Sequence, residues 1–573
     1  MRFVPSPSLL YPIALLGLAI FPPILSLAAP SVTEPTATLD VTLAMTRQPD
    51  GMASGVAVSY TYTAPTTSTA PLTLVLDTLE PGLERSTDRV TSLTLTDDRG
   101  VLPIGAAVRR PNGPRTFETW TTTRPASGVV HVSYRMHVAR GAVAKRGPQV
   151  DLQAAGGGVS GGYVGIFVLP DATAKFRTRV HWQLPAGTMA VTSHGEGDYT
   201  GTFTADQLTG TLFLAGPVKA YRPAGQAKDT GLEVYGLGVA QEQLRGAGNW
   251  AAAAYAADVK AFKLDGNRPY RFMVRSFEGG TNASGRAAEH SFMLYVPPGT
   301  NPDTNQLHYV VAHEMVHSLA RYLEKEDVEG DWYTEGLANY IALTVPDAAG
   351  LYTPAEYLEL VREESAGYYT NAKRSLPNDA LAATVWSGRN AWKIPYNRGT
   401  MYLADLDAKL EAHGSHVRVL DLANEMSARI ESGAPSDRHT WLDVLSTRVG
   451  SWAIKDWNDM MDGKIIFPAP GAFGPCMHSR KEDVRIFDLG FSSPVRLLTG
   501  ATIDGLVNGS EAERAGLRNG DVLDTGADIN PAAASLDEPV VLHVRRSGKP
   551  VTISFDPRGG SQPGLAWSSS CVP

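Results

Sequence analysis

Apolar and polar residues alternate with a period of two along several segments between residues 36 and 221. In the clearest segment, 130–138, the chain reads Val-His-Val-Ser-Tyr-Arg-Met-His-Val, so that every second residue is apolar. This period indicates strands that bury one face. Gly- and Pro-rich breaks such as 156–162 separate the segments. The pattern predicts an all-β, sandwich-like N-terminal domain over residues 29–221.

A different pattern begins near residue 222. Residues 270–275 and 290–296 have the composition of strands, whereas the apolar residues from Leu307 onward follow the helical period. Strands followed by helices are typical of an α+β domain, which we expect to span residues 222–475.

Short apolar runs return towards the C-terminus and indicate a small α/β domain, which we place at residues 476–573. The chain contains two cysteines, Cys476 and Cys571, and both lie in this domain. In an oxidising compartment such a pair forms a disulfide, and two free thiols are the alternative. We predict the disulfide because the segment between the cysteines has the pattern of one compact domain.

The N-terminus has the pattern of a targeting segment. Arg2 precedes an apolar run at 9–27, and small residues follow at 26–28. This arrangement predicts a signal peptide over residues 1–28 and an exported protein, periplasmic or secreted. A membrane anchor is the alternative, since ~20 apolar residues span a bilayer. The three prolines within the run favour cleavage, so we expect membrane association only if the segment stays uncleaved.

Composition narrows the classes of partner. Of the 573 residues, 43% are hydrophobic and 19% are charged, which is typical of a globular protein with buried cores. The formal net charge is -8, and no dense run of Lys and Arg occurs. Nucleic-acid binding is therefore not expected. The sequence leaves the oligomeric state open.

The segment 310–317 contains the pattern His-Glu-x-x-His. Residues four apart lie on one face of a helix, so His313 and His317 can direct ring nitrogens at one metal ion. Glu314 points elsewhere and suits a general base that acts on water. Alone, the pattern also fits two ordinary helical histidines. Glu335, in a second predicted helix after a charged turn, supplies a third ligand and predicts one catalytic zinc ion with an open position.

These motifs, His-Glu-x-x-His followed by Trp-x-x-Glu-Gly-x-x-x-Tyr, resemble those of the gluzincin metallopeptidases, and in particular the glycyl aminopeptidase family and aminopeptidase N relatives. The resemblance implies a thermolysin-like α+β zinc domain. It also implies that His313, His317 and Glu335 bind zinc and that Glu314 is the general base.

Two further residues are assigned by the same resemblance. Tyr396, in Pro-Tyr-Asn-Arg-Gly, matches a Tyr that donates to the oxyanion; a Tyr packed at a helix start is the alternative. The relatives hold the substrate amine with a Glu on a Gly-rich edge strand, and here Glu289 is the candidate although residues 281–288 interrupt the motif. A carboxylate at the zinc cleft would support exopeptidase action, and a solvent-facing one would remove that support.

The segment from Phe487 resembles a bacterial PDZ domain, most clearly over 510–523. The resemblance implies that Leu489, Gly490 and Phe491 offer backbone N–H groups to a peptide C-terminus. A structural lid is the alternative.

Three functions are consistent with the sequence. The first is a metallo-aminopeptidase that acts on peptides. The second is an exported endopeptidase or quality-control protease whose PDZ domain binds chain termini. The third is a non-enzymatic peptide-binding protein, which intact Glu314 and Tyr396 disfavour.

Overall fold

The computed structural model describes residues 36–572 apart from short internal segments. These segments are residues 65–68, 78, 81–82, 85–88, 113–114, 139–149, 172–174, 225–230, 266–268, 277–282, 324–329, 385–387, 493–496, 498 and 528. The predicted signal peptide lies outside the described residues, and so does Gly279–Gly280, the glycine pair that precedes the interruption at 281–288.

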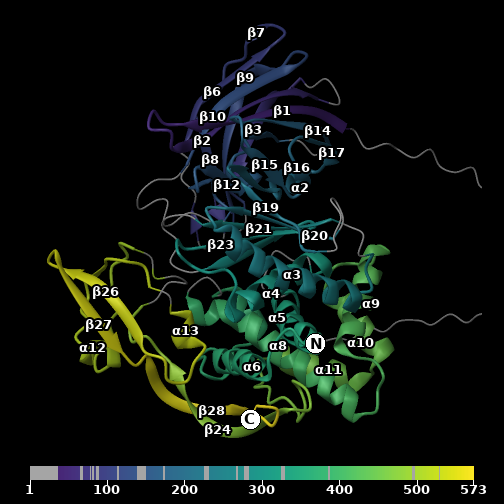
Figure 1. Cartoon of the computed structure of the whole chain (residues 1–573), viewed down its shortest axis with the longest axis vertical. Coiled ribbons are helices and arrows are strands. Elements are labelled where there is room, and N and C mark those ends of the chain that lie inside the picture. Colours follow the sequence, from purple (N-terminus) through teal and green to yellow (C-terminus); the bar gives the residue numbers. More distant parts are fainter. Residues whose placement is uncertain are drawn as a thin grey trace, which may run out of the picture.

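The N-terminal region is built from strands, as the alternating pattern predicts (Figure 1). They are β1 (Thr36–Arg47), β2 (Ala53–Thr63), β3 (Pro71–Asp77), β4 (Leu79–Glu80), β5 (Leu83–Glu84), β6 (Val90–Asp97), β7 (Gly100–Val101), β8 (Val108–Asn112), β9 (Arg115–Pro125), β10 (Val130–His137), β11 (Gln153–Ala155), β12 (Gly158–Gly162), β13 (Leu169–Pro170), β14 (Lys175–Gln183), β15 (Met189–Thr192), β16 (Gly195–Glu196), β17 (Tyr199–Phe203) and β18 (Leu212–Gly216), with helix α2 (Ala205–Thr209) and the short helix η1 (Tyr163–Gly165).

Among the described residues, these strands form three larger sheets, in the orders β17-β14-β1-β2-β10-β6-β7, β11-β12-β18-β15-β16 and β13-β3-β9-β8. Strand β10 shows why the pattern specifies the sheet. Val130, Val132, Tyr134 and Met136 are each 2% exposed, while the residues between them face outward. Burying one face of each strand in a shared apolar core holds the sheets together.

A five-stranded sheet follows, in the order β19-β20-β21-β23-β22. Its strands are β19 (Lys219–Tyr221), β20 (Leu232–Leu237), β21 (Tyr270–Ser276), β22 (Ser284–Ala288) and β23 (Ser291–Val296). Strands β20, β21 and β23 are parallel, and β22 is an antiparallel edge strand. Helices α3 (Gln241–Ala261) and α4 (Asn305–Leu319) pack on one face of this sheet.

The other face of this sheet packs on the N-terminal region. Met273 and Met293 of the sheet share an apolar core with Leu214 of β18. Arg275 is fully buried, and its Nη1 donates to the carbonyl oxygens of Asp151 (3.2 Å) and Ser160 (3.0 Å). A buried guanidinium is stable only when its N–H groups are bonded in this way, so Arg275 ties the two regions together.

The helical region continues the chain and contains the largest apolar core. Its helices are α5 (Asp331–Ala348), α6 (Pro354–Tyr369), α7 (Asn378–Ala382), α8 (Arg389–Ala412), α9 (Val419–Glu431), α10 (Arg438–Arg448) and α11 (Ser451–Met461). Trp332 and Trp441 are fully buried at its centre. Strands followed by helices confirm the predicted α+β order. None of the helices in the described part of the chain is long and apolar enough to cross a membrane.

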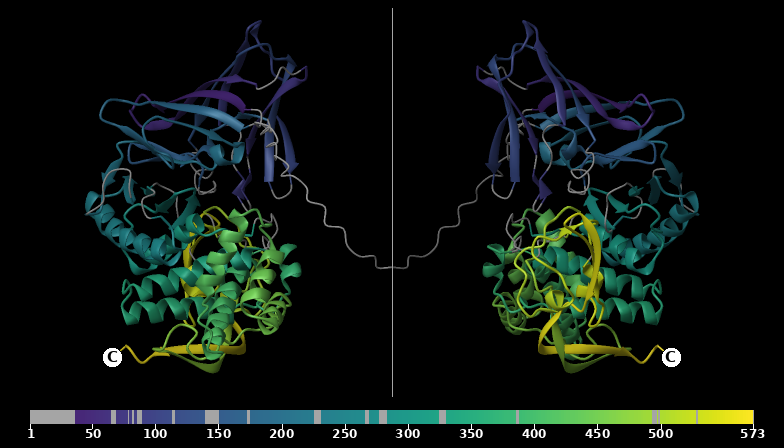
Figure 2. Two further views of the ribbon diagram at one scale, coloured as in Figure 1. Left: turned by 90° about the vertical axis from the view of Figure 1, so that its right-hand side faces the viewer. Right: turned by 90° about the vertical axis from the view of Figure 1, so that its left-hand side faces the viewer.

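The C-terminal segment has two parts. Strands β24 (Met477–Phe487) and β28 (Arg558–Ser569) form a ribbon beneath the helices (Figure 2). Val484 and Trp567 of this ribbon belong to the core of the helical region, and Trp567 Nε1 donates to Ser365 Oγ (2.9 Å). The chain predicted as one domain from residue 476 therefore begins and ends with strands that pack on the helices.

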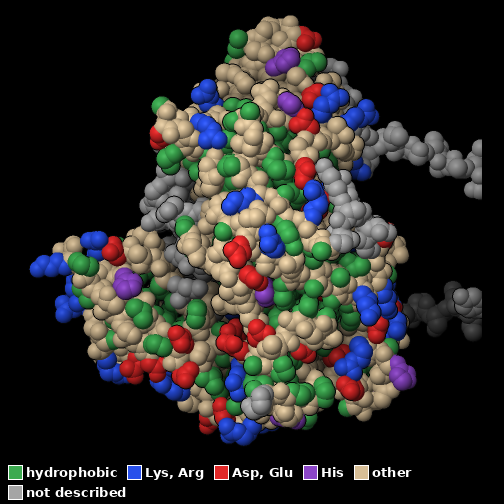
Figure 3. Space-filling view, viewed as in Figure 1, with side chains coloured by type: hydrophobic (Ala, Val, Ile, Leu, Met, Phe, Trp, Pro, Cys, Tyr) green, Lys and Arg blue, Asp and Glu red, His purple; other side chains and the backbone are tan. Residues whose placement is uncertain are grey.

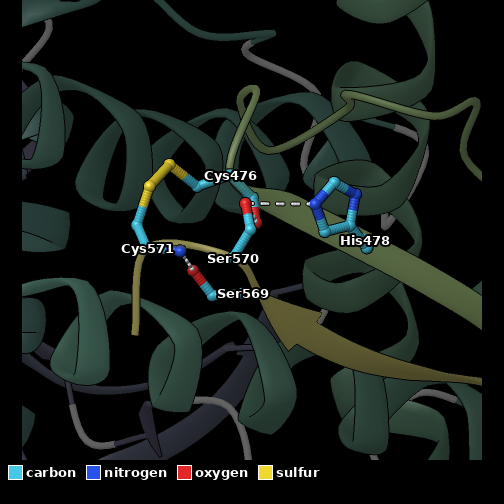
Figure 4. Close-up of a disulfide and its surroundings, with 5 residues drawn as sticks. All are labelled: Cys476, His478, Ser569, Ser570 and Cys571. Carbon is cyan, nitrogen blue, oxygen red and sulfur yellow. Dashed lines mark hydrogen bonds between the residues drawn. A yellow bond between two sulfur atoms is a disulfide. The ribbon is translucent and has the colours of Figure 1, made fainter. Parts of the chain in front are cut away.

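Between these two strands lies a smaller unit with its own core. It contains α12 (Glu511–Arg514), β25 (Val522–Leu523), α13 (Asn530–Ala533), β26 (Val540–Arg546) and β27 (Lys549–Phe555). Cys476 and Cys571 are bonded at the end of the ribbon, which confirms the predicted disulfide (Figure 4). On the molecular face in Figure 3, acidic and basic side chains are interspersed.

Candidate active site

Helix α4 is held on the five-stranded sheet by its apolar face and by Ser318. Leu307, Val311 and Met315 enter the core between the helices and the sheet. Tyr270 Oη of β21 donates to Ser318 Oγ (2.9 Å), which lies 3.1 Å from the carbonyl oxygen of Ala288. The helical spacing then places both histidines of the motif on the opposite side, towards α5.

Three donor atoms converge between α4 and α5. The Nε2 atoms of His313 and His317 are 3.0 Å apart, and Glu335 Oε2 lies 3.2 Å from the first and 3.3 Å from the second. Glu335 is in the first turns of α5, as predicted. Helix α5 runs back against α4, which brings the carboxylate to the histidines.

The charges of the three side chains are strongly coupled. Burial alone would raise the pKa of Glu335, but His317 and His313 hold this pKa well below its usual value. Burial alone would lower the pKa of His317, but the carboxylates of Glu335 and Glu314 raise it. The cluster therefore favours an ionised carboxylate facing imidazole groups.

The three residues fit a zinc ion. Glu335 Oε2 is buried and accepts no hydrogen bond, although a buried carboxylate oxygen requires a partner. Four ligands in tetrahedral geometry at ~2.1 Å from zinc stand about 3.4 Å from one another, close to the separations observed here. Two His and one Glu form the donor set of catalytic zinc sites, which keep a fourth position open.

Glu314 lies beside the edge strand β22. A Cβ atom built on Gly285 would stand 2.4 Å from Cγ and 2.7 Å from Oε1 of Glu314, which is closer than real Cβ contacts. The glycine therefore provides the space in which the Glu314 side chain lies, next to the converging donors.

Tyr396 reaches the site from α8. The rings of Tyr396 and His313 are nearly parallel, with centroids 6.2 Å apart. Burial raises the pKa of Tyr396 well above its usual value, and the carboxylates of Glu335, Asp331 and Glu314 raise it further. The phenol stays protonated and can donate a hydrogen bond over the whole physiological pH range.

Two glycines allow α5 and α8 to pack closely together, which brings Tyr396 of α8 to the site. A Cβ on Gly399 would stand 1.9 Å from the Trp332 carbonyl oxygen, and one on Gly336 would stand 2.5 Å from Gly399 Cα. The residue after Tyr396 and Asn397, Arg398, is fully buried and donates to the carbonyl oxygens of Arg374 and Leu376. The Arg398 guanidinium therefore stabilises the packing of α8 and takes no part in the candidate active site.

Several residues near His313, His317 and Glu335 were not identified from the sequence. His313 Nδ1 is 2.7 Å from Asn339 Oδ1, and the Asn339 amide in turn donates to Glu364 (3.1 Å). The ring of Tyr322 packs against His317, with centroids 5.8 Å apart. Burial, Glu314 and Glu335 raise the pKa of Tyr322 to about 12. Asn339 lies inside the recognised motif, but Glu364 has no local spacing that connects it to the histidines.

The prediction that Glu289 holds the substrate amine loses its structural support. Its side chain is 67% exposed and lies 3.9 Å from His290 Nε2, beyond the end of β22. Within the described part of β22, Ala287 shares the face of Gly285, and no residue of the strand carries a carboxylate. Glu289 lies in the turn that joins β22 to β23, and its side chain faces solvent there.

In the C-terminal unit, Leu489 and Phe491 are buried in the local core. The N–H of Gly490 donates to Asp488 Oδ1 (2.8 Å), and its carbonyl oxygen accepts from Val507 N–H (2.8 Å). The predicted peptide-binding N–H at Gly490 is thus bonded within the chain.

Comparison with known proteins supports the fold. No family model matches the sequence, and no curated protein matches it. Among solved structures, an aminopeptidase N family protein from Idiomarina loihiensis superposes with a TM-score of 0.63 at 15% identity, covering 93% of this chain and 98% of that one. This chain therefore has an aminopeptidase N-like fold along most of its length.

Two further structures share less of the chain. An M1 zinc metallopeptidase from Deinococcus radiodurans has a TM-score of 0.44 at 17% identity, with 76% of this chain and 95% of that chain covered. Native yeast LTA4 hydrolase has a TM-score of 0.47 at 13% identity, with 76% and 68% covered.

Proposed function

We propose that this chain is a zinc-dependent metallopeptidase, with the aminopeptidase activity for which the protein of the same fold is named. The observation that carries the proposal is the convergence of His313, His317 and Glu335 around a point where a buried carboxylate oxygen lacks a hydrogen bond. Zinc held there would activate water at neutral pH and polarise the scissile carbonyl.

The residues around the ligands supply the remaining chemistry. Glu314, one position after His313, accepts a proton from the attacking water at its carboxylate and later passes it to the leaving amine. Tyr396 donates its phenolic hydrogen to the oxygen of the carbonyl as negative charge develops on it. Gly285 leaves the space that the Glu314 side chain occupies. The close packing of α5 on α8 at Gly336 and Gly399 positions Tyr396.

One experiment tests the proposal directly. Metal analysis of the purified protein should find one zinc per chain, and turnover of an aminoacyl reporter substrate should be lost on chelation and restored by zinc. Glu314→Ala should retain zinc but lose at least a hundredfold in kcat, since general bases contribute about 10²–10⁴-fold. Zinc-free wild type, or unchanged turnover in Glu314→Ala, would falsify the proposal and favour a non-enzymatic peptide-binding protein.

An endopeptidase is the second candidate, and the exposure of Glu289 favours it. Aminoacyl reporters compared with N-blocked peptides separate the two activities. An aminopeptidase cleaves only the former, whereas an endopeptidase accepts blocked ends. In either case Glu289→Gln should leave kcat/KM unchanged.

The C-terminal unit is proposed as a PDZ-like domain in a thermolysin-like, exported protease. The independent core of this unit and its three-stranded sheet support that assignment. The disulfide supports export, because such bonds persist in oxidising compartments. Since Gly490 N–H is bonded to Asp488, peptide binding would require this loop to open. Titration of the protein with peptides that have free termini tests whether the C-terminal unit binds them.

A further inference from the structure

Glu364, on α6, accepts hydrogen bonds from three other helices of the site. Its Oε1 accepts from Tyr309 Oη of α4 (2.9 Å). Its Oε2 accepts from Nδ2 of Asn339 on α5 (3.1 Å) and from Nδ2 of Asn397 on α8 (2.9 Å). These helices carry the two histidines, Glu335 and Tyr396, respectively. One carboxylate therefore joins all the elements that supply the proposed zinc ligands and the oxyanion donor.

The bond to Asn339 determines which nitrogen of His313 carries hydrogen. An ionised carboxylate only accepts, so the Asn339 amide must direct its nitrogen at Glu364 and its oxygen at His313. That oxygen is 2.7 Å from His313 Nδ1, and an amide oxygen only accepts. His313 Nδ1 must then carry the hydrogen. The lone pair is left on Nε2, which faces Glu335 and is the atom that would bind metal.

The bond to Asn397 acts on α8. Asn397 is 6% exposed, and its amide packs against α6 next to Gly367, where a Cβ would stand 3.1 Å from both amide atoms. The amide is therefore enclosed between Glu364 and the next turn of the same helix. Since Asn397 follows Tyr396 directly, fixing this amide fixes the turn of α8 that carries the phenol.

We propose that Glu364 is a positioning residue, which fixes the His313 tautomer through Asn339 and the Tyr396 turn through Asn397. This inference rests on the zinc site of the proposed function. Loss of a residue that hydrogen-bonds a metal-bound histidine typically lowers metal affinity or activity by about 10- to 100-fold. Glu364 acts on His313 indirectly, through the Asn339 amide, whose orientation it determines.

The test measures the zinc dissociation constant of the full chain by competition with a chromophoric chelator, alongside the melting temperature of the metal-free protein. Glu364→Leu removes every acceptor and should weaken zinc binding about 10- to 100-fold. Glu364→Gln should stay within about threefold of wild type, because its amide oxygen can accept from both asparagines and its nitrogen can donate to the Tyr309 hydroxyl. Glu359→Leu, an exposed position on the same helix, should bind zinc like wild type.

If Glu364→Leu does not fold, Glu364→Ala replaces it, since water can then reach the three donors but cannot hold the amide in one orientation. A lower melting temperature with an unchanged zinc affinity would mean a purely structural role and would overturn the inference. So would equal losses in the Gln and Leu variants. Wild type that binds no zinc would instead defeat the proposed function itself, which distinguishes the two failures.

Discussion

Gly285 gives the Glu314 side chain its space beside strand β22. Gly285→Ala should therefore displace the carboxylate and lower kcat by about 100-fold, the effect of a misplacement of roughly 1 Å. Zinc content should not change, because the three atoms nearest to an added Cβ all belong to Glu314 and none to a histidine. The measurement is kcat and zinc stoichiometry of the variant. Gly560→Ala, where nothing lies within 4 Å of an added Cβ, is the matched control. An unaltered kcat in Gly285→Ala would contradict the assignment.

Glu363 offers a residue-scale prediction about pH. Burial raises its pKa to about 7, and Glu359 and Glu364 add to the effect. Between the usual carboxyl pKa and 7, the unfolded chain loses this proton before the folded protein does, so stability falls as pH rises through that window and stays reduced above it. Glu363→Gln removes this loss of stability, because glutamine does not ionise.

Glu363→Gln should stabilise the protein by roughly 1 to 3 kcal/mol at pH 8 and by much less at pH 5. Thermal melts of wild type and variant at the two pH values measure the difference. A shift of equal size at both pH values would show that ionisation of Glu363 is not its cause.

Local spacing was sufficient to predict His313, Glu314 and His317, because one helical turn brings the histidines together without help from the rest of the chain. Glu335 required a helix, a turn and a returning helix, and it was predicted from the motif around it. Glu364 could not be predicted, since its partners come from three helices and no spacing along the sequence relates them.

At the scale of elements, the crossing of α5 and α8 determines where Tyr396 lies. The sequence placed Gly336 and Gly399 beside the functional residues but did not show that the two glycines meet. Only the packed structure shows that each provides space for the other helix. Two helices can pack as closely as α5 and α8 only where each has a glycine at the point of contact.

Gly399→Ala tests this crossing. Alanine favours an isolated helix over glycine by about 1 kcal/mol, so propensity alone would stabilise the variant. The clash with the Trp332 carbonyl should instead destabilise it by about 1 to 3 kcal/mol and lower kcat, because Tyr396 moves with α8. Melting temperature and kcat are the measurements. Gly105→Ala, with an ordinary contact at 3.5 Å, should change neither value. A stabilised, active Gly399→Ala would contradict the crossing.

The end of edge strand β22 shows a feature that the sequence could not predict. The expectation for Glu289 was based on the order of residues in a family motif, and the structure turns that side chain to solvent. Glu289 lies in the turn between β22 and β23, directly after the last strand residue, Ala288. Where a short edge strand ends and its turn begins depends on pairing with the neighbouring strand, which the hydrophobic pattern of this segment could not specify.

At the scale of the whole molecule, the C-terminal ribbon supports the helical region. Arg374 Nη1 donates to the carbonyl oxygen of Pro563 (2.6 Å), and Trp567 bonds Ser365 next to Glu364. The chain thus returns from its last unit to pack on the helix that carries the central carboxylate of the site. The Cys476–Cys571 bond closes this arrangement.

Replacing both cysteines with serine should lower the free energy of unfolding by about 3 to 5 kcal/mol, because the bond closes a long loop in the unfolded chain. The residues it joins are separated by 95 positions. Thermal melts with and without reductant measure the effect. Reductant should lower the melting temperature of wild type and leave the double variant unchanged. A wild type insensitive to reductant, with both thiols shown to be free, would contradict this prediction.

The sequence by itself determined the β-rich N-terminal region, the order of strands and helices, the disulfide partners and the cluster of His313, His317 and Glu335. Each of these follows from short-range periodicity, from a pair of cysteines, from a helical turn or, for Glu335, from the motif around it. The tertiary structure alone decided the exposure of Glu289, the space at Gly285 and Gly399, and the three bonds to Glu364. These depend on strand pairing and on helix packing, which place residues in ways that no local pattern specifies.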